Sequence, residues 1–311
     1  MKIEFIISAV IAFIFLAGCG SNSGQINETP TSGNIKIAVD EAYKLLFDTE
    51  IDTFESLYKY AKINPIYKPE GEAIALFMKD SVRFVVASRK LTDAEDQLLR
   101  SQKYIPKTEK ICYDALAFII NKDNQDSLLL YDNIKDIFSG KITKWTEINP
   151  KSTLGDITVV FDNNQSGNTR MIKEKLELKN NFPSNCFAVK SNPEVLSYIE
   201  KNKNAIGIIS VNWISDKNDS VSHRFLKNMR VVSVGSIGNT DGTGDYWKPY
   251  VGNIADGSYP FTREVYIINR ETFTGLGTGF VSFITHDKGQ RIILKSGLMP
   301  ATMPVRYIET K

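Results

Sequence analysis

Strand-type and helix-type segments alternate along this chain from residue 35 onward, and this alternation restricts the possible folds more than any other feature. Short apolar runs, typical of buried strands, are separated by stretches in which apolar residues recur at helical spacing. Such a pattern predicts an α/β fold with mostly parallel sheets. The predicted strands are residues 35–39, 82–87, 115–120, 157–161, 205–210 and 263–268.

Helices are predicted between these strands from their apolar spacing and their end signals. Gly140 and Gly297 are the expected stops of two helices, because glycine adopts the left-handed conformation at little cost. Asn192-Pro193 is the expected start of another helix. The predicted helices carry Tyr43, Leu46 and Phe47; Phe54, Leu57, Tyr58 and Ala61; residues 133–138; Val195 and Ile199; and residues 280–294.

Polar residues follow three of the predicted strands. Asp40-Glu41 comes after the first strand, Ser88-Arg89 after the second, and the loop 165–170 after the strand 157–161. Ligands of parallel α/β sheets bind beyond the carboxyl ends of the strands. We therefore expect these three segments to lie together at a ligand site.

The loop 165–170 has the sequence QSGNTR and leads from a strand into a helix. The first N–H groups of a helix have no intrahelical acceptor, and the helix dipole is positive there, so this junction can bind an anion. A capped helix with a solvated arginine is the alternative. The candidate ligand residues are Ser166, Gly167, Asn168, Thr169 and Arg170.

The N-terminus is predicted to be a targeting segment, residues 1–18, with Lys2 followed by the apolar run 5–16. This run is too short to span a membrane well. The segment Leu16-Ala17-Gly18-Cys19 resembles the bacterial lipobox, in which Cys19 would carry the lipid; an ordinary secretory cleavage site is the alternative. Residues 20–34 are small and polar, typical of a flexible tether. The body would then be held at a membrane surface outside the cytoplasm.

Composition argues against several other classes of protein. Hydrophobic residues make up 42% of the chain and the net charge is only +2, without a basic stripe, so no nucleic-acid partner is expected. Cys112 and Cys186 either pair or remain free thiols. Two histidines, His223 and His286, without a Cys-x-x-Cys motif, give no support to a metal site, and no cofactor is expected.

Six sequence blocks, in order, resemble those of the phosphate-binding proteins of bacterial ABC importers. The resemblance extends over about residues 35–300. Its most specific block is DIFSGKITKW at residues 136–145, and SGNTR at 166–170 resembles the phosphate loop of that family. The other blocks are 85–92 (VVASRKLT), 115–121 (ALAFIIN), 205–210 (AIGIIS) and 259–266 (YPFTREVY).

This resemblance implies a two-lobed type 2 periplasmic-binding-protein fold. Its crossovers would lie near residues 112–114 and 259–263. Inorganic phosphate would bind in the cleft and pass to an ABC importer permease, and the protein would be a monomeric, non-enzymatic lipoprotein facing the periplasm or the cell surface. The implied parts are a signal peptide (1–18), a lipidated tether (19–33), lobe 1 (34–113 plus 262–311) and lobe 2 (114–261).

The chain departs from the family pattern at two positions. Asp40-Glu41 stands where the family carries a Gly-Ser-type turn. These acids either cap a helix or accept a hydrogen bond from a protonated ligand oxygen. The arginine usual about four residues before the loop serine is absent, since Asp162 occupies that position. The candidate binding residues are therefore the loop 166–170 together with Ser88, Arg89, Asp40 and Glu41, with Arg170 or Arg89 replacing the missing charge.

Two alternatives are also compatible with the sequence. The same fold could bind another oxyanion or a small organic acid, or it could serve as a surface lipoprotein without a transport role. An enzyme is the more remote alternative. Ser56-x-x-Lys59, Tyr131-x-Asn133 and Lys295-Ser296-Gly297 occur in the order of the penicillin-binding serine acyltransferases. Lys295, however, lies at the end of a predicted helix, where that class requires a strand edge.

Overall fold

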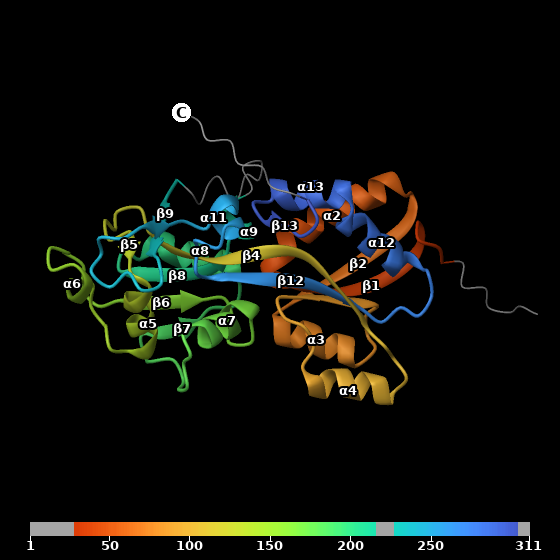
Figure 1. Ribbon diagram of the computed structural model, residues 1–311, viewed down its shortest axis with the longest axis horizontal. Coiled ribbons are helices and arrows are strands. Elements are labelled where there is room, and N and C mark those ends of the chain that lie inside the picture. The colour runs from red at the N-terminus through yellow and green to blue at the C-terminus, as the bar shows by residue number, and fades with distance from the viewer. Residues whose placement is uncertain (1–27, 216–226, 304–311) are drawn as a thin grey trace, which may run out of the picture.

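Two α/β halves lie side by side in the computed structural model, which describes residues 28–215 and 227–303 (Figure 1). The long strands β4 (Lys107–Asn121) and β12 (Thr262–Asn269) run between them. The first half contains β1 (Ser32–Asp40), β2 (Tyr60–Lys68), β3 (Phe84–Ala87) and β13 (Met299–Pro300), with the short helix η1 (Glu41–Tyr43) and helices α2 (Lys44–Leu57), α3 (Glu70–Met78), α4 (Asp93–Ser101), α12 (Leu276–Thr285) and α13 (Asp287–Lys295).

The second half is built from shorter strands. Its strands are β5 (Leu128–Leu129), β6 (Thr158–Phe161), β7 (Cys186–Ala188), β8 (Ala205–Ser210), β9 (Met229–Val231), β10 (Ser233–Gly235) and β11 (Tyr246–Trp247). Its helices are α5 (Tyr131–Ser139), α6 (Trp145–Ile148), α7 (Gly167–Lys175), α8 (Asn192–Lys201), α9 (Asn212–Ser215) and α11 (Val251–Ala255).

One sheet passes through both halves, in the strand order β2-β1-β3-β12-β4-β8-β6-β7. The outer strands of this sheet are parallel in each half, as in the pairs β1–β2 and β6–β8, whereas β10 and β11 of the separate small sheet pair antiparallel. Strands β12 and β4 pair antiparallel with each other and with their outer neighbours β3 and β8. The sheet is therefore mixed: its outer strands are parallel, as predicted, and antiparallel pairing is added where β4 and β12 run between the halves.

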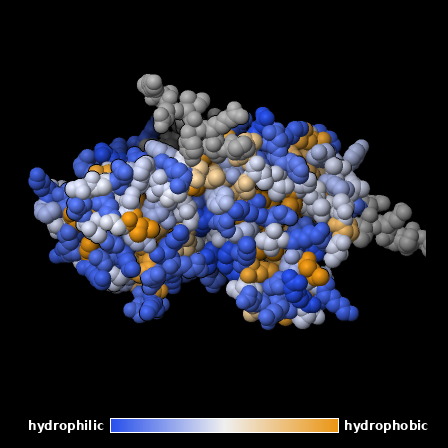
Figure 2. All heavy atoms as spheres, in the orientation of Figure 1, coloured by the Kyte–Doolittle hydropathy of each residue, from blue (hydrophilic) through white to orange (hydrophobic). Residues whose placement is uncertain are grey.

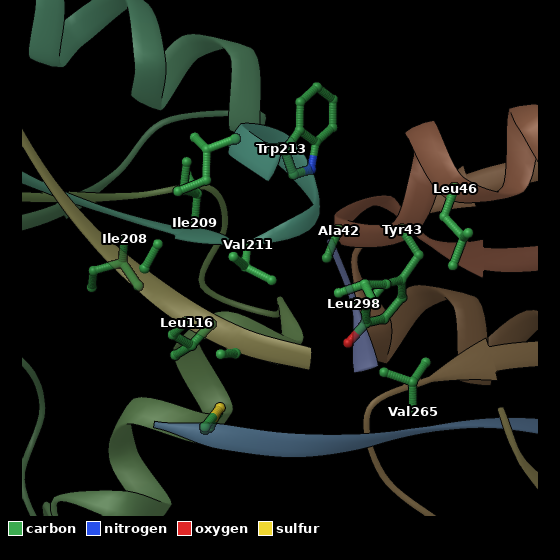
Figure 3. Close-up of a cluster of buried hydrophobic side chains, with 14 of the residues drawn as sticks. Ala42, Tyr43, Leu46, Leu116, Ile208, Ile209, Val211, Trp213, Val265 and Leu298 are labelled. Carbon is green, nitrogen blue, oxygen red and sulfur yellow. The ribbon is translucent and has the colours of Figure 1, made fainter. Parts of the chain in front are cut away.

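Strand β4 changes partners along its length. Residues up to Ala115 pair with β12, and residues from Leu116 onward pair with β8. Figure 3 shows the apolar side chains at this junction, where Ala42 from the first half lies beside Val211 from the second. Burial of such side chains, worth about 1.5–3 kcal/mol each, supports the junction from both sides. The face of the molecule seen in Figure 2 is largely hydrophilic, with its apolar residues in small separate groups.

The predicted strands are all present, but the helices near both ends of the chain differ from prediction. The two helices expected around Tyr43 and Phe54 form one continuous helix, α2, and Ala61 belongs to strand β2. The late helix is divided at His286 into α12 and α13. Gly289 allows the start of α13 to lie close to the end of α12, because a Cβ at Gly289 would lie 2.4 Å from the Cα of Ile284.

The expected tether is partly incorporated into the fold. Glu28 forms an ion pair with Arg83 at 3.1 Å and accepts a hydrogen bond from the N–H of Leu276, and β1 begins at Ser32. Residues 28–34 are therefore packed rather than free. The expected signal peptide, Cys19 and the earlier part of the tether lie outside the described residues. In the ranges that are described, no helix is both long enough and apolar enough to traverse a membrane.

Candidate ligand-binding site

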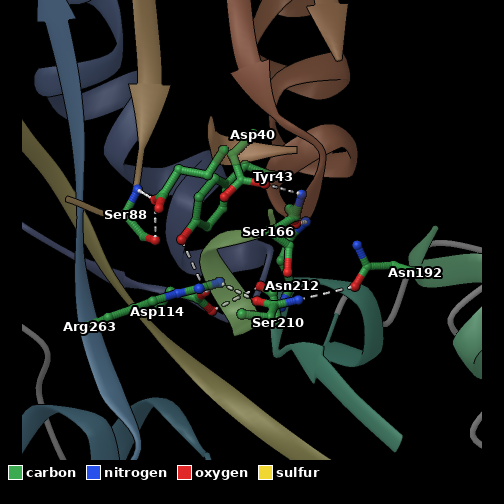
Figure 4. A network of polar contacts seen from close by, with 12 residues as sticks. Asp40, Tyr43, Ser88, Asp114, Ser166, Asn192, Ser210, Asn212 and Arg263 are labelled. Atoms are coloured by element: carbon green, nitrogen blue, oxygen red, sulfur yellow. Dashed lines mark hydrogen bonds and ion pairs between the residues drawn. The ribbon is translucent and has the colours of Figure 1, made fainter. Parts of the chain in front are cut away.

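The three polar segments predicted to meet do meet between the two halves (Figure 4). Gly167, the first residue of α7, is the point of contact. A Cβ placed on Gly167 would lie 2.6 Å from Ser88 Oγ, 2.8 Å from Asp40 Oδ2 and 3.0 Å from Glu70 Oε1. Since only a glycine fits this contact, the start of α7 closes directly onto the strand ends of the other half.

Asp162 organises the loop that precedes α7. Its carboxylate accepts hydrogen bonds from Ser166 Oγ at 2.6 Å and from Asn168 Nδ2 at 3.0 Å. Ser166 Oγ in turn accepts a hydrogen bond from the N–H of Thr169, so Ser166 is the N-cap of α7. Burial raises the pKa of Asp162. The acid that stands where a cation was expected therefore holds the loop serine and asparagine in place.

Arg170 connects the two halves and is not a solvated arginine. Its Nε donates to Glu70 Oε2 at 2.6 Å, and its Nη2 donates to Ser88 Oγ at 2.9 Å and to the Ser88 carbonyl at 3.1 Å. Its Nη1 donates to Glu174 on its own helix at 2.6 Å. The charge predicted for this site is present, but it is bound to an acid of the opposite half.

Glu70, at the start of α3, is a central residue of the site that sequence reasoning missed. Its Oε1 accepts hydrogen bonds from the N–H of Ser88 at 2.7 Å and from Ser88 Oγ at 2.6 Å. Burial by itself would raise the pKa of Glu70, but the bonds from Arg170 and Ser88 outweigh burial and lower it. Glu70 is therefore an ionised, fully coordinated carboxylate.

Asp40 and Glu41 both face the second half. Asp40 Oδ1 accepts from the N–H of Ala42 at 3.1 Å, as predicted for a helix cap, while Oδ2 has no partner among the residues described. Burial, followed by the charge of Glu70, raises the pKa of Asp40 well above its usual value. Burial and then Asp162 raise the pKa of Glu41 to about 7, although the N–H of Asn192 on α8 lowers it.

A buried ion pair lies beneath the loop, where β4 and β12 run side by side. Arg263 donates to Asp114 Oδ2 from Nε at 2.9 Å and from Nη2 at 2.7 Å, and Nη2 also donates to Asn168 Oδ1 at 2.8 Å. Tyr43 and Ser210 donate to the same carboxylate group. Arg263 was not predicted as a site residue. The feature that could have indicated it is the presence of an arginine in an otherwise apolar predicted strand.

The remaining predicted residues have other contacts. Both Arg89 Nη atoms donate to Glu95 of α4, at 2.7 and 2.8 Å, and this pairing lowers the pKa of Glu95 to about 2. Arg89 still lines a groove of about 500 Å³ at the edge of the site, beside Arg170 and Lys173. Cys112 and Cys186 are both free. The described ranges contain no group of histidine, cysteine and acidic residues that could hold a metal, and His223 lies outside them.

The residues of the remote enzyme hypothesis are not arranged as a catalytic group. Ser56 on α2 donates to the carbonyl of Thr53 at 2.7 Å, and Tyr131 on α5 donates to the carbonyl of Lys175 at 2.6 Å. Lys295 is the last residue of helix α13, so it does not lie on a strand edge. The serine and the lysine thus have the helical positions that their apolar spacing predicts.

Two α/β halves, joined by a pair of strands and meeting at a polar cleft, define the class of two-lobed binding proteins. The family model of the PBP superfamily domain matches residues 25–288, and the chain belongs to this superfamily. Its fold is the two-lobed type 2 periplasmic-binding-protein fold predicted from the sequence, and the halves are called lobe 1 and lobe 2 below.

Several known proteins are similar to this chain over most of its length. The phosphate-binding protein PstS of Staphylococcus aureus (strain USA300) is 25% identical over 293 residues, which cover 91% of this chain and 83% of the relative. A Clostridium perfringens crystal structure, described as a phosphate ABC transporter substrate-binding protein with bound phosphate, is 25% identical with a TM-score of 0.72, covering 87% of this chain and 100% of that one. A phosphate transport receptor from Vibrio cholerae, at 20% identity and a TM-score of 0.63, covers 87% of this chain and 100% of its own and supports the fold alone.

Replacing Gly167 with alanine is expected to prevent the closed contact between the lobes. The added methyl group would overlap Ser88, Asp40 and Glu70, and overpacking of this kind costs about 1–3 kcal/mol. Small-angle X-ray scattering of the ligand-free variant should therefore give a larger radius of gyration than wild type. Gly155→Ala is the control, because no atom of the described residues beyond its chain neighbours lies within 4 Å of its Cβ position. An unchanged radius for the Gly167 variant would contradict the contact.

Proposed function

We propose that this protein is an extracytoplasmic solute-binding lipoprotein that captures inorganic phosphate between its lobes and delivers it to the permease of an ABC importer. The observation that carries the proposal is the meeting of the α7 N-terminus with Ser88 of lobe 1. Helix N–H groups, a hydroxyl and a guanidinium are the donors that bind oxyanions. The named functions of the similar proteins from Staphylococcus aureus and Clostridium perfringens support phosphate as that oxyanion.

The proposed ligand residues are the loop 166–170 and Ser88, with Asp40 and Glu41 facing them. Acidic side chains outnumber cations around this cleft, so the site favours a protonated oxyanion over a fully ionised one. Arg263, through Asn168, holds the loop in place. Anchorage through Cys19 and docking to a permease belong to the proposal as well.

We also propose the lobe boundaries predicted from the sequence, with residues 34–113 and 262–311 in lobe 1 and 114–261 in lobe 2. The change of partner of β4 between Ala115 and Leu116 supports the first boundary. The start of β12 at Thr262 supports the second. Closure would then be a hinge motion about these two strands.

Calorimetry on a soluble form that starts at Ser21 tests the proposed function. We expect micromolar binding of phosphate, about −8 kcal/mol, and no response to sulfate. Ser88→Ala should weaken phosphate binding by about tenfold to a hundredfold, because a hydrogen bond to a charged group contributes about 1.5–3 kcal/mol. Ser101→Ala, an exposed serine of α4, is the matched control. Folded, ligand-free protein that responds to neither anion would refute phosphate capture, and organic acids would be titrated next.

Glu41 is expected to make anion binding weaker as the pH rises from 6 to 8. The pKa of Glu41, about 7 against an ordinary 4.5, means that its carboxyl ionises in this interval beside Asp162 and Glu194, with Lys44 as the nearby cation. The same titration removes stability from the folded protein between pH 4.5 and 7, because burial favours the neutral acid. Between pH 6 and pH 8 the affinity of wild type for the anion should fall roughly fivefold further than the affinity of Glu41→Gln, a difference of about 1 kcal/mol. Equal decreases in both proteins would contradict this role.

A further inference from the structure

We propose that Glu70 is an internal ligand of the anion site, whose carboxylate occupies the donors of the closed cleft and must be displaced by any incoming anion. Glu70 would thereby determine which anions bind and how tightly. The proposal relies on the proposed function only for the identity of the incoming anion. The internal contact itself stands on the geometry of the ligand-free cleft.

The donors around Glu70 are those that would hold an oxyanion from solution. They comprise the backbone N–H and the Oγ of Ser88, at 2.7 and 2.6 Å, and the guanidinium of Arg170, whose Nε lies at 2.6 Å. Ser88 belongs to lobe 1 and Arg170 to lobe 2, so the carboxylate joins the lobes as a bound ligand would. Glu70 is only 2% exposed, and the α-carbon of Gly167 faces its Oε1.

Neighbouring contacts hold Glu70 in this position. The N–H of Gly71 donates to the carbonyl of Gln165 at 3.1 Å, which ties the first turn of α3 to the loop of lobe 2. Glu41 of lobe 1 accepts from the N–H of Asn192 at the start of α8. Lobe 1 thus presents carboxylates to the positive ends of lobe 2 helices, an arrangement that stabilises closure without an external anion.

An anion and the Glu70 carboxylate cannot occupy the site together. Ser88 Oγ already lies 2.6 Å from the Cβ position of Gly167, so the closed cleft has no space for a phosphate between them. Both donors of Ser88 are also taken by Glu70. The apparent affinity for an anion is therefore reduced by the fraction of molecules in which Glu70 holds its donors.

Ligand-free protein provides the first test. We expect Glu70→Gln, which removes the charge and preserves the size, to open the cleft and increase the radius of gyration measured by small-angle X-ray scattering. Glu72→Gln is the matched control, because Glu72 lies on the same helix and forms an exposed ion pair with Lys68. Arg170→Gln, which removes the partner on lobe 2, should open the cleft as well and replaces the first variant if that one fails to fold. Equal radii for wild type and the folded variants would overturn the proposal.

Calorimetry with inorganic phosphate provides the second test. Glu70→Gln should bind phosphate at least tenfold more tightly than wild type, whereas Glu72→Gln should match wild type. Weaker binding by Glu70→Gln would mean that the carboxylate assists the ligand, and would overturn the internal competition while leaving phosphate capture intact. Absence of phosphate binding in wild type, Glu70→Gln and Glu72→Gln would instead refute the proposed function. The scattering experiment alone would then test whether Glu70 holds the lobes closed.

Discussion

Replacing Arg263 with methionine is expected to destabilise the protein by about 3–5 kcal/mol, one of the two largest effects predicted for a single residue of this chain. Methionine keeps much of the volume of the side chain but leaves Asp114 as a buried charge without its cation. Arg263 and Asp114 are 7% and 0% exposed. Asn168 also loses its donor, so the loop before α7 should loosen at the same time.

Urea unfolding monitored by circular dichroism measures this loss. Arg291→Met is the control, because Arg291 and its partner Asp287 are both about two-thirds exposed and such surface pairs contribute little. Combining Arg263→Met with Asp114→Asn should cost less than the sum of the single losses, since the second change removes the uncompensated charge. A loss below about 1 kcal/mol for Arg263→Met would show that the pair is not the essential contact between the strands.

Replacing Glu50 with glutamine is expected to make the protein more stable than wild type at pH 8 by about 2–4 kcal/mol. Glu50 lies on the buried face of α2, and neither of its carboxyl oxygens has a hydrogen-bond partner among the residues described. Burial raises its pKa from the ordinary 4.5 to about 9. The folded protein therefore holds a proton that the unfolded chain releases above pH 4.5.

The sign of the effect follows from this difference in bound protons. Between pH 4.5 and pH 9 the folded state binds more protons than the unfolded state, so wild-type stability decreases as the pH rises and levels off above 9. Glutamine cannot ionise, so the stability of the variant should lack the part of this decrease with pH that Glu50 contributes. Chemical unfolding at pH 5, 6.5 and 8 measures it, with Asp52→Asn on the exposed face of α2 as the control for loss of one carboxylate. If the free energy of unfolding changed with pH equally in wild type and in Glu50→Gln, the raised pKa of Glu50 would be contradicted.

Strand β2 and helix α3 show where sequence reasoning failed and why. Phe54, Leu57, Tyr58 and Ala61 have helical spacing, yet the chain leaves α2 at Leu57 and continues as the edge strand β2. Among the described strands β1 alone pairs with β2, which contains Pro65 and lacks the continuous apolar run of the central strands. Because β2 was not recognised, Glu70, which follows it at the start of α3, was not recognised as a site residue.

Local chemistry was sufficient for the parts of the fold that depend on neighbouring residues. The apolar runs predicted strands β1, β3, β4, β6, β8 and β12, and the positive φ values of Gly140 and Gly297, +78° and +77°, confirm the predicted helix stops. Ser166 caps α7 as its place between strand and helix predicts. In these cases side-chain periodicity and glycine conformation act over a few residues, which a sequence displays directly.

The sequence by itself determined the α/β class, most strand positions and the loop that begins α7, since all of these follow from local patterns. Only the tertiary structure decided the direction of β4 and β12 in the sheet and the partner of each charge. Arg170 meets Glu70 across 100 positions of the chain, and Arg263 meets Asp114 across 149. The physical reason is that charge pairing depends on separation in space. Folding brings together residues that are far apart along the chain, so the sequence positions do not indicate which charges pair.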